Sequence, residues 1–357
     1  MFKVHNEGII LEPTYDFEKN GVFNPACIAV GDEVWMYFRG VSAENVSTIG
    51  LSKYKDNELI KHFDEPIITP EHDYESCGVE DPRISFVDGT YYMFYTAYDG
   101  TNAQIAYATT KKLPYFQKQG LLLPEITYED AGKLWEKSNL SLRYESFEKL
   151  YENSRGKNVL LWEKDCFLFP EKINGKFALC HRILPGIQIV YFNKFSDLNR
   201  EFWLDHLKNL DKHVLLEPKY WYDSWNVGGG CPPIKTDAGW LLIYHAVESS
   251  SLGRTYYASA ALLDLENPQK IIGRLKNPLI SPTYSYEKKG VVDNVVFPTS
   301  VLEVNNRFYI YHGAGDQCIA LKSIDKDDLI KDLKTIDTAP ELTIIEESKK
   351  TPIDKTR

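Results

Sequence analysis

Five segments of the chain repeat one pattern, in which a strand leads through a tight turn into a second strand rich in aromatic residues. They read FNPACIAVGDEVWMYFRG, EDPRISFVDGTYYMFYTA, DCFLFPEKINGKFALCHRI, GGCPPIKTDAGWLLIYHA and NVVFPTSVLEVNNRFYIYHGA. Their turns contain Gly, Asn or Asp, which supply the positive φ that tight hairpins need. Because aromatic residues favour strands, the pattern predicts an all-β fold.

The spacing of the segments predicts how the strands are grouped. The turns are centred on Gly31, Asp88, Asn174, Asp237 and Asn305. Each interval has room for about four strands, and radial repetition of four-stranded sheets is typical of a β-propeller. We therefore expect a single five-bladed β-propeller domain over residues 1–357, ending in a C-terminal tail at 340–357. A two-sheet sandwich, whose turns recur more often, is the alternative.

The longest interval contains an insertion at residues 125–158, between the second and third blades. Thr127 followed by Asp130 resembles a helical capping box with Asp in place of Glu or Gln. A stripe of apolar residues then recurs at helical spacing: Leu140, Tyr144, Phe147 and Tyr151. The insertion is expected to form one or two amphipathic helices. These either pack on the propeller or border a binding site or subunit contact.

Composition excludes several kinds of partner. A net charge of −10 disfavours nucleic acids and anionic membranes, which attract basic surfaces. No segment approaches the roughly 20 apolar residues of a transmembrane helix, and no signal peptide is recognised. Six cysteines are scattered without a CxxC pair, which favours free thiols in a reducing compartment. We expect a cytoplasmic protein without a metal site, and leave open whether it forms a homo-oligomer.

The repeat also places charged residues together. The start of one strand and the end of the next meet opposite the turn, so residues at these positions converge if the five hairpins are equivalent. They are Asn24, Arg39, Asp81, Lys164, Asp165, Arg182 and His245, with Asp316 after the last strand. Within GVEDPRI, Pro82 is expected to hold Asp81 in a stiff, extended backbone. Cations beside one fixed acid suit an anionic ligand, whereas a ring of structural ion pairs is the alternative.

The motifs and their order resemble those of glycoside hydrolase family 130, which contains the β-mannoside phosphorylases and related β-mannosidases. The resemblance is carried by FNPA, GVEDPRI, LFPEKINGKFALCHR, GGGCPPIKTDAGWLLIYHAV, AALLDLENPQKIIGR, NVVFPTS and HGAGD. It extends from about Asn24 to Leu321, apart from the insertion. It implies a five-bladed propeller that needs no cofactor and uses inorganic phosphate as co-substrate.

The resemblance further implies roles for single residues. Asp81, in the EDPR motif, matches the family's general acid. Lys164, Arg182 and His245 match its phosphate-binding residues, although similar enzymes carry arginine at the first of these positions. Substrate-binding residues are expected at Asn24, Arg39, Arg83, Tyr98, Asp165, Asn226 and Asp316. Asn226 stands where family phosphorylases commonly carry a basic residue, which predicts weaker phosphate binding.

An inverting phosphorylase is therefore the leading hypothesis. It would cleave a β-mannoside with phosphate to give α-mannose 1-phosphate and a shortened sugar, with Asp81 protonating the leaving oxygen directly or through a sugar hydroxyl. An inverting hydrolase needs a second carboxylate as base, whereas phosphate needs only to be positioned by cations. A β-mannosidase that uses water and a non-catalytic carbohydrate-binding propeller are the alternatives.

Several neighbouring residues have secondary interpretations. Glu80 is an alternative acid beside Asp81. His181 alternates away from Arg182 along its strand and is expected to be structural. Candidates for stacking on sugar rings, each also typical of a core or rim aromatic, are Tyr98, Trp221 and Trp225.

Overall fold

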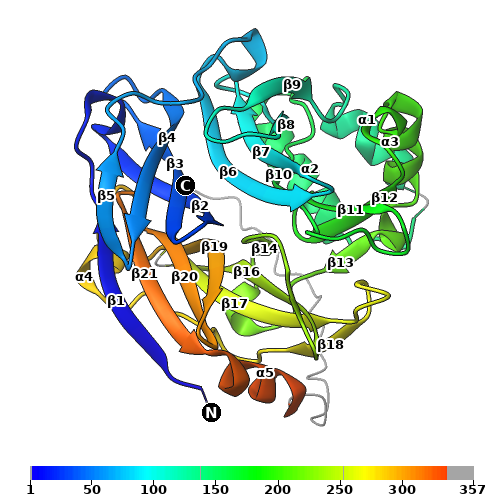
Figure 1. Cartoon of the computed structure of the whole chain (residues 1–357). Helices are drawn as coiled ribbons and strands as arrows, with labels where there is room; N and C mark the ends of the chain where they lie inside the picture. The colour runs from blue at the N-terminus through cyan, green and yellow to red at the C-terminus, as the bar shows by residue number, and fades with distance from the viewer. Residues whose placement is uncertain (1, 137, 252, 336–357) are drawn as a thin grey trace, which may run out of the picture.

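The computed structural model describes residues 2–136, 138–251 and 253–335, and strands predominate in it (Figure 1). The all-β prediction is confirmed. The expected tail at 340–357 lies outside the described residues. Each of the six cysteines is a free thiol, and five of them are buried. Among the described residues, no helix is both long and apolar enough to span a bilayer.

The strands of the described residues form four hydrogen-bonded sheets. The first contains β2 (Gly21–Val30), β3 (Glu33–Val41), β4 (Ser47–Lys55), β5 (Glu58–His62), β6 (Gly78–Val87), β7 (Thr90–Tyr98), β8 (Ala103–Thr110) and β9 (Gln117–Leu121). The second contains β10 (Lys164–Leu168), β11 (Phe177–Arg182), β12 (Ile187–Phe192) and β13 (Val214–Leu216). The third contains β14 (Asn226–Gly229), β15 (Ile234–Thr236), β16 (Gly239–Ser250), β17 (Gly253–Leu263) and β18 (Ile271–Arg274). The fourth contains β1 (Val4–Leu11), β19 (Val296–Val304), β20 (Arg307–Ala314) and β21 (Cys318–Asp325).

The first sheet consists of two antiparallel units, β2–β5 and β6–β9. They are linked by a parallel bridge between Ser47 and Gly78. A Cβ on Gly78 would lie 2.7 Å from the Cβ of Ser47, so only glycine permits this approach. In the fourth sheet, the N-terminal strand β1 pairs antiparallel with β21. The first and last strands of the described chain are therefore hydrogen-bonded to each other.

Apolar clusters fill the spaces between consecutive units. Met36 and Phe38 of β3 pack in one cluster with Ile319 of β21. Phe167 of β10 and Trp240 of β16 share another. Because a strand alternates its faces, each unit can bury one face against the unit before it and the other against the unit after it. The units follow one another around the molecule in chain order (Figure 1).

Among the described residues, three strands are bulged at a non-glycine residue with positive φ. These three register shifts lie in β2, β6 and β10. They contain Asn24 (φ 51°), Asp81 (φ 53°) and Asp165 (φ 56°). The expectation of an extended backbone at Asp81 is therefore wrong. Asp and Asn tolerate this conformation better than most residues, and a bulge re-aims the side chain that it carries.

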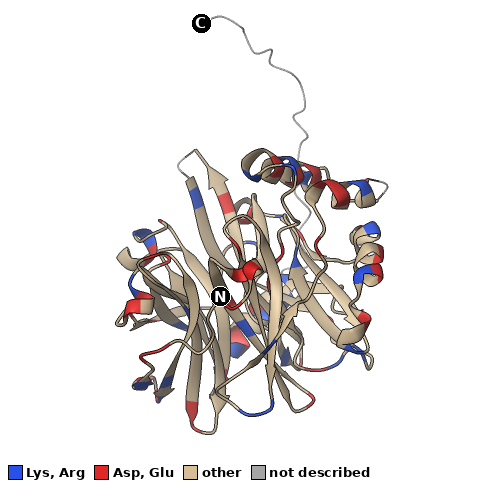
Figure 2. Cartoon of the chain, turned by 90° about the horizontal axis from the view of Figure 1, so that it is seen from above, with Lys and Arg blue, Asp and Glu red and all other residues tan. Residues whose placement is uncertain are grey.

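The insertion forms two helices, α1 (Tyr128–Trp135) and α2 (Arg143–Arg155), within the expected range. Thr127 caps α1, because its Oγ1 accepts a hydrogen bond from the backbone N–H of Asp130 at 3.1 Å. Tyr144 and Phe147 of the apolar stripe are buried. The other α-helices of the described residues are α3 (Arg200–Lys208), which packs on α1, α4 (Ser285–Lys288) and α5 (Lys326–Thr335). Acidic and basic residues are interspersed on the helices and near strand ends (Figure 2).

Candidate active site

Asp81 lies among polar side chains from several strands. Its Oδ1 accepts a hydrogen bond from Asn24 Nδ2 at 2.8 Å and lies 3.3 Å from Arg39 Nη1. The side chain of Asp81 is 9% exposed. Both of these contacts involve Oδ1, and Oδ2 makes no hydrogen bond with the described residues. One oxygen is therefore held in place while the other is left for a ligand.

Glu80, the alternative acid, forms ion pairs with two cations. Its Oε1 lies 2.7 Å from Arg39 Nη2, and its Oε2 lies 3.3 Å from Lys164 Nζ. Both oxygens are thus engaged in ion pairs. This arrangement favours Glu80 as the residue that holds the cations in place and leaves Asp81 as the better proton donor.

Arg83 and Asp165 form a buried ion pair behind Asp81. Arg83 Nη2 lies 3.4 Å from Asp165 Oδ1, and the two side chains are 1% and 2% exposed. Arg83 also donates hydrogen bonds to the carbonyl oxygens of Asp81, at 2.9 Å, and of Gly230. It therefore braces the bulge that presents Asp81.

Lys164 and Arg182 face each other across β10 and β11, where they are directly paired. Arg182 Nη1 lies 3.1 Å from Asp165 Oδ2 and 3.4 Å from His245 Nε2. The Nε of Arg182 is buried and has no hydrogen-bond partner among the described residues. His245 stacks on Phe297, with 4.3 Å between ring centres. The cations are thus paired with carboxylates on one side but keep unused donors.

Two glycines make room for these side chains. A Cβ on Gly228 would lie 2.2 Å from His245 Cε1 and 2.7 Å from Asp165 Oδ2. A Cβ on Gly313 would lie 2.4 Å from Asn24 Oδ1. The glycine run at 228–230 and the glycine before Ala314 are therefore required by close approach, which the motifs alone did not reveal.

Asp81 is ionised in the unliganded protein at neutral pH. Burial works against ionisation, but the pKa of Asp81 lies below its ordinary value of 3.8. The positive fields of Arg39, Lys164 and Arg83 outweigh burial, and the hydrogen bond from Asn24 adds to them. The same cations that suit an anion therefore hold the proton off Asp81.

At Asp316 and His245 burial dominates, and it favours the neutral form of each side chain. Burial raises the pKa of Asp316 to about 6, and the nearby Asp81 contributes to the rise against the field of Arg39. Burial lowers the pKa of His245 to about 3, despite the opposing effect of Asp165. His245 is therefore neutral at neutral pH. It contributes a hydrogen-bonding group to this cluster, not the positive charge that the sequence suggested.

A cavity of about 150 Å³ lies beside the cations, with Lys164, Arg182 and Asn226 on its wall. Trp225, one of the stacking candidates, also lines it. Tyr98 does not line it, but its ring packs edge-on against Trp162, which does, with 6.1 Å between ring centres.

Trp221 lies outside this cavity. Its side chain is 54% exposed and packs against Tyr222 and Tyr257. Of the three stacking candidates, only Trp225 is among the residues that line the cavity in the described part of the chain.

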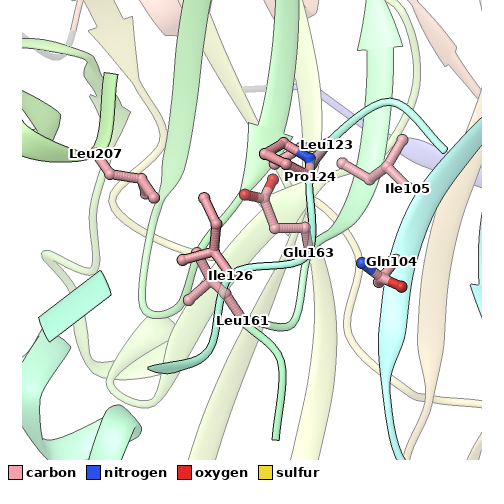
Figure 3. A pocket seen from close by; sticks show the side chains of 8 residues that line it. All are labelled: Gln104, Ile105, Leu123, Pro124, Ile126, Leu161, Glu163 and Leu207. Atoms are coloured by element: carbon pink, nitrogen blue, oxygen red, sulfur yellow. The ribbon is translucent and has the colours of Figure 1, made fainter. Parts of the chain in front are cut away.

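A much smaller cavity, of about 10 Å³, is lined by Glu163, the residue before Lys164 (Figure 3). Its wall is largely apolar and includes Glu163, whose carboxylate lies among Leu123, Pro124 and Ile126 in Figure 3. Such a volume suits about one water molecule. It is therefore too small for a sugar.

His181 belongs to this buried region, as expected for a structural residue. Its Nδ1 lies 2.6 Å from Glu163 Oε2, and its Nε2 lies 3.0 Å from His206 Nε2. Because side chains alternate along a strand, Glu163 and His181 face away from the site that Lys164 and Arg182 border.

Some cavity residues were not identified from the sequence. Trp162, Arg254 and Tyr256 line the same cavity as Lys164, together with Tyr151 of the predicted helical stripe. Trp162 had a usable signal, since it precedes Lys164 by two positions and extended chains place such residues on one face. Arg254 had none, because only strand pairing brings it near.

Comparison with known proteins gives consistent results. A family model described as beta-1,4-mannooligosaccharide phosphorylase matches residues 6–335. A 1,2-beta-oligomannan phosphorylase from Thermoanaerobacter sp. (strain X514) is 32% identical over 88% of this chain and 93% of its own. A beta-1,2-mannobiose phosphorylase from the same organism is also 32% identical, over 89% of this chain and 95% of its own.

Solved structures share the fold. That of beta-1,2-mannobiose phosphorylase from Listeria innocua, in complex with beta-1,2-mannobiose, has a TM-score of 0.68 at 21% identity. It is matched over 93% of this chain and 99% of its own. A glycosyl hydrolase from Bacteroides ovatus has a TM-score of 0.67 at 22% identity and covers 87% of this chain and 86% of its own.

Proposed function

The chain belongs to glycoside hydrolase family 130, and on this premise we propose that it is an inverting phosphorylase of β-mannosides. It cleaves the substrate with inorganic phosphate, without a cofactor, and releases α-mannose 1-phosphate and a shortened sugar. Two relatives that match most of the chain are named as phosphorylases of 1,2-β-linked mannosides, which supports this reaction. The observation that carries the proposal is the pair Lys164 and Arg182, with unused donors, beside one acid that has a free oxygen.

The fold is proposed to be a five-bladed propeller. The division of the first sheet at the Ser47–Gly78 bridge supports this, because it leaves five successive antiparallel units. The pairing of β1 with β21 completes the fifth unit from the other end of the chain. The apolar clusters between consecutive units are also what such an arrangement requires.

Asp81 is proposed as the general acid. Its bulged backbone, the hydrogen bond that its Oδ1 accepts from Asn24, and an Oδ2 without a hydrogen bond to the described residues support this role. An anion bound near Lys164 would offset part of the positive field that now lowers the pKa of Asp81. Binding of phosphate would therefore favour the protonated form of Asp81 that the reaction needs.

Lys164, Arg182 and His245 are proposed to bind phosphate. Arg182 offers an unpaired Nε, and Lys164 uses one of its three donors on Glu80. Phosphate needs no general base, so the carboxylates here can serve to hold cations. Substrate binding is assigned to Asn24, Arg39, Tyr98, Asn226 and Asp316, with Arg83 and Asp165 bracing the site from behind.

The test is product analysis with and without phosphate. β-1,2-Mannobiose and β-1,4-mannobiose would each be incubated with the protein, and α-mannose 1-phosphate and free mannose measured separately. We expect α-mannose 1-phosphate only when phosphate is present. Equal release of mannose in phosphate-free buffer would support a β-mannosidase, and binding without turnover would support a carbohydrate-binding propeller.

The reaction is proposed to take place in the cytoplasm. The free state of all six cysteines supports a reducing compartment. Fractionation of the native host, followed by detection with an antibody, would check this placement.

A further inference from the structure

The cavity beside the phosphate cations is closed on one side by the insertion. Helix α2 contributes Phe147, Leu150 and Tyr151 to its wall. The volume of about 150 Å³ is roughly ten times the 10–15 Å³ that a cavity needs to hold one water molecule. The insertion is therefore part of a built cavity at the site, in addition to its packing on the strands.

The charged residues that line this cavity are all positive. Three cations line it, namely Lys164, Arg182 and Arg254, and none of its described lining residues is an acid. Lys164 and Arg182 have carboxylate partners in Glu80 and Asp165. Arg254 has no carboxylate within ion-pair distance among the described residues. An unneutralised guanidinium in a cavity favours an anionic occupant.

Strand pairing places Arg254 on the same face as Asn226. Val247 of β16 pairs with both Asn226 of β14 and Tyr256 of β17, so the three residues stand in one row across the sheet. Arg254 precedes Tyr256 by two positions and shares its face. Asn226 is the position where the family resemblance implies a cation that this chain lacks. Arg254 therefore brings a positive charge to the face where that cation is missing.

Aromatic contacts hold Arg254 over the cavity. Its guanidinium carbon lies 5.0 Å from the ring centre of Trp225. Trp225 is in turn packed edge-on by Phe147 of α2, with 5.0 Å between ring centres. The helix thus supports the ring on which the arginine rests, and an arginine stacked on an aromatic ring keeps its N–H groups free to donate.

Tyr151 adds a neutral donor from the same helix. Burial raises its pKa, against the opposing fields of Arg182, Lys164 and Arg254. The hydroxyl is therefore protonated at neutral pH and surrounded by cations. No hydrogen bond of this hydroxyl is recorded with the described residues, and its ring packs on Trp162 at 4.8 Å between centres.

We propose that Arg254 and the Tyr151 hydroxyl complete the phosphate site, and that Arg254 replaces the cation absent at Asn226. The ligand is inorganic phosphate in the forward reaction and the phosphoryl group of α-mannose 1-phosphate in the reverse. This inference rests on the proposed phosphorolysis. It assigns to the insertion a role in binding phosphate, where the sequence left open packing, a binding site or a subunit contact.

The experiment compares Arg254→Met with the parent over a phosphate series. Removing one charged hydrogen-bond donor should raise the phosphate KM by about tenfold, and Tyr151→Phe should raise it less. Arg254→Lys should recover part of the loss, because it keeps the charge but loses the planar fork. Both changed positions line a cavity, and Arg254 is exposed, so folding should be preserved.

Arg155→Met is the matched control. Arg155 is also an exposed arginine over a tryptophan ring, at 5.3 Å from the centre of Trp162, but it does not line the cavity. The Arg155→Met change removes the same charge and should leave the phosphate KM within about twofold of the parent, because the Arg155 side chain is exposed and does not line the cavity.

A second readout does not depend on turnover. Phosphate that binds the folded protein raises its unfolding temperature, and this rise should be smaller in Arg254→Met than in the parent and in Arg155→Met. An unchanged phosphate KM and an unchanged thermal shift in Arg254→Met would overturn the inference. So would a raised acceptor KM in the reverse reaction with an unchanged phosphate KM, which would make the cavity an acceptor site. A parent that needs no phosphate would instead refute the proposed function itself.

Discussion

Two buried arginine–aspartate networks in this protein differ in how completely they are satisfied. Arg274 and Asp223 are 2.6 Å apart. Arg274 also donates to Tyr244 Oη at 2.9 Å and to the Glu217 carbonyl at 2.8 Å. The other oxygen of Asp223 accepts two backbone N–H groups, at 2.8 and 2.6 Å. In this network the donors and acceptors are matched.

The network around Arg83 and Asp165 is incomplete. Four buried polar atoms near it have no hydrogen-bond partner among the described residues: Asn24 Oδ1, Arg182 Nε, Asn226 Oδ1 and His245 Nδ1. Leaving such groups unpaired costs about 1–3 kcal/mol each. A fold tolerates that cost where a ligand later fills the places. The contrast separates ion pairs that stabilise the fold from ion pairs that prepare a site.

Within the incomplete network, substitution of Asp81 should have the largest effect on turnover. Asp81→Asn keeps the shape of the side chain but removes the transferable proton. Turnover should fall by about 10²–10⁴-fold, the usual contribution of a general acid, while the unfolding temperature changes little. Steady-state kinetics and thermal melts of the same preparation would measure both. Near-parental turnover in the folded variant would remove Asp81 from this role.

Substitution in the network of Arg274 and Asp223 should lower the stability of the protein and leave catalysis by the folded protein unchanged. Arg274→Met leaves Asp223 buried without its cation, which typically destabilises a protein by about 3–5 kcal/mol. Denaturant unfolding should detect this loss, whereas the phosphate KM of the folded fraction should match that of the parent. If Arg274→Met raised the phosphate KM as much as Arg182→Ala does, the two networks would not differ in function.

Ionisation of Asp316 makes the stability of the protein depend on pH. Its pKa is about 6 in the folded protein, raised by burial from 3.8, so the folded state holds a proton that the unfolded chain has lost. This stabilisation is fully present below pH 3.8 and disappears as the pH rises through 6. Asp316→Asn cannot ionise, so at pH 8 it should be more stable than the parent.

The expected gain at pH 8 is about 2 kcal/mol, reduced from the full linkage value because the side chain is partly exposed. Most of the difference should be gone at pH 4. Urea unfolding at the two pH values would measure it. A difference that is the same at both would mean that ionisation of Asp316 is not the cause.

Substitutions of the proposed phosphate-binding residues should have the smallest of these effects, expressed as free energy. Arg182→Ala should raise the phosphate KM by about tenfold or more, which is roughly 1.4 kcal/mol per factor of ten. His245→Ala should raise it less, because His245 is neutral and offers one hydrogen bond. Cleavage by water should be affected far less. Unchanged phosphate dependence in both variants, with equal cleavage in its absence, would favour the mannosidase.

Much of the site was visible in the motifs, for reasons that particular residues make clear. Asp81 and Arg182 belong to hairpins whose turns and aromatic strands repeat, so their positions could be aligned across repeats. Arg254 belongs to no motif, and it is placed by its pairing opposite Ser249 in β16. The glycines at 228–230 were part of a recognised motif, but the close approach that requires them depends on side chains from other strands.

The sequence by itself determined the all-β class, the insertion helices and the kinds of groups at the candidate site. These follow from local turn chemistry, periodicity and residue type. Only the tertiary structure decided that Asp81 has a positive φ, that His245 is neutral and that Glu80 is occupied by Arg39 and Lys164. The physical reason is that a bulge depends on strand register, and that protonation and pairing depend on burial and on charges from distant parts of the chain.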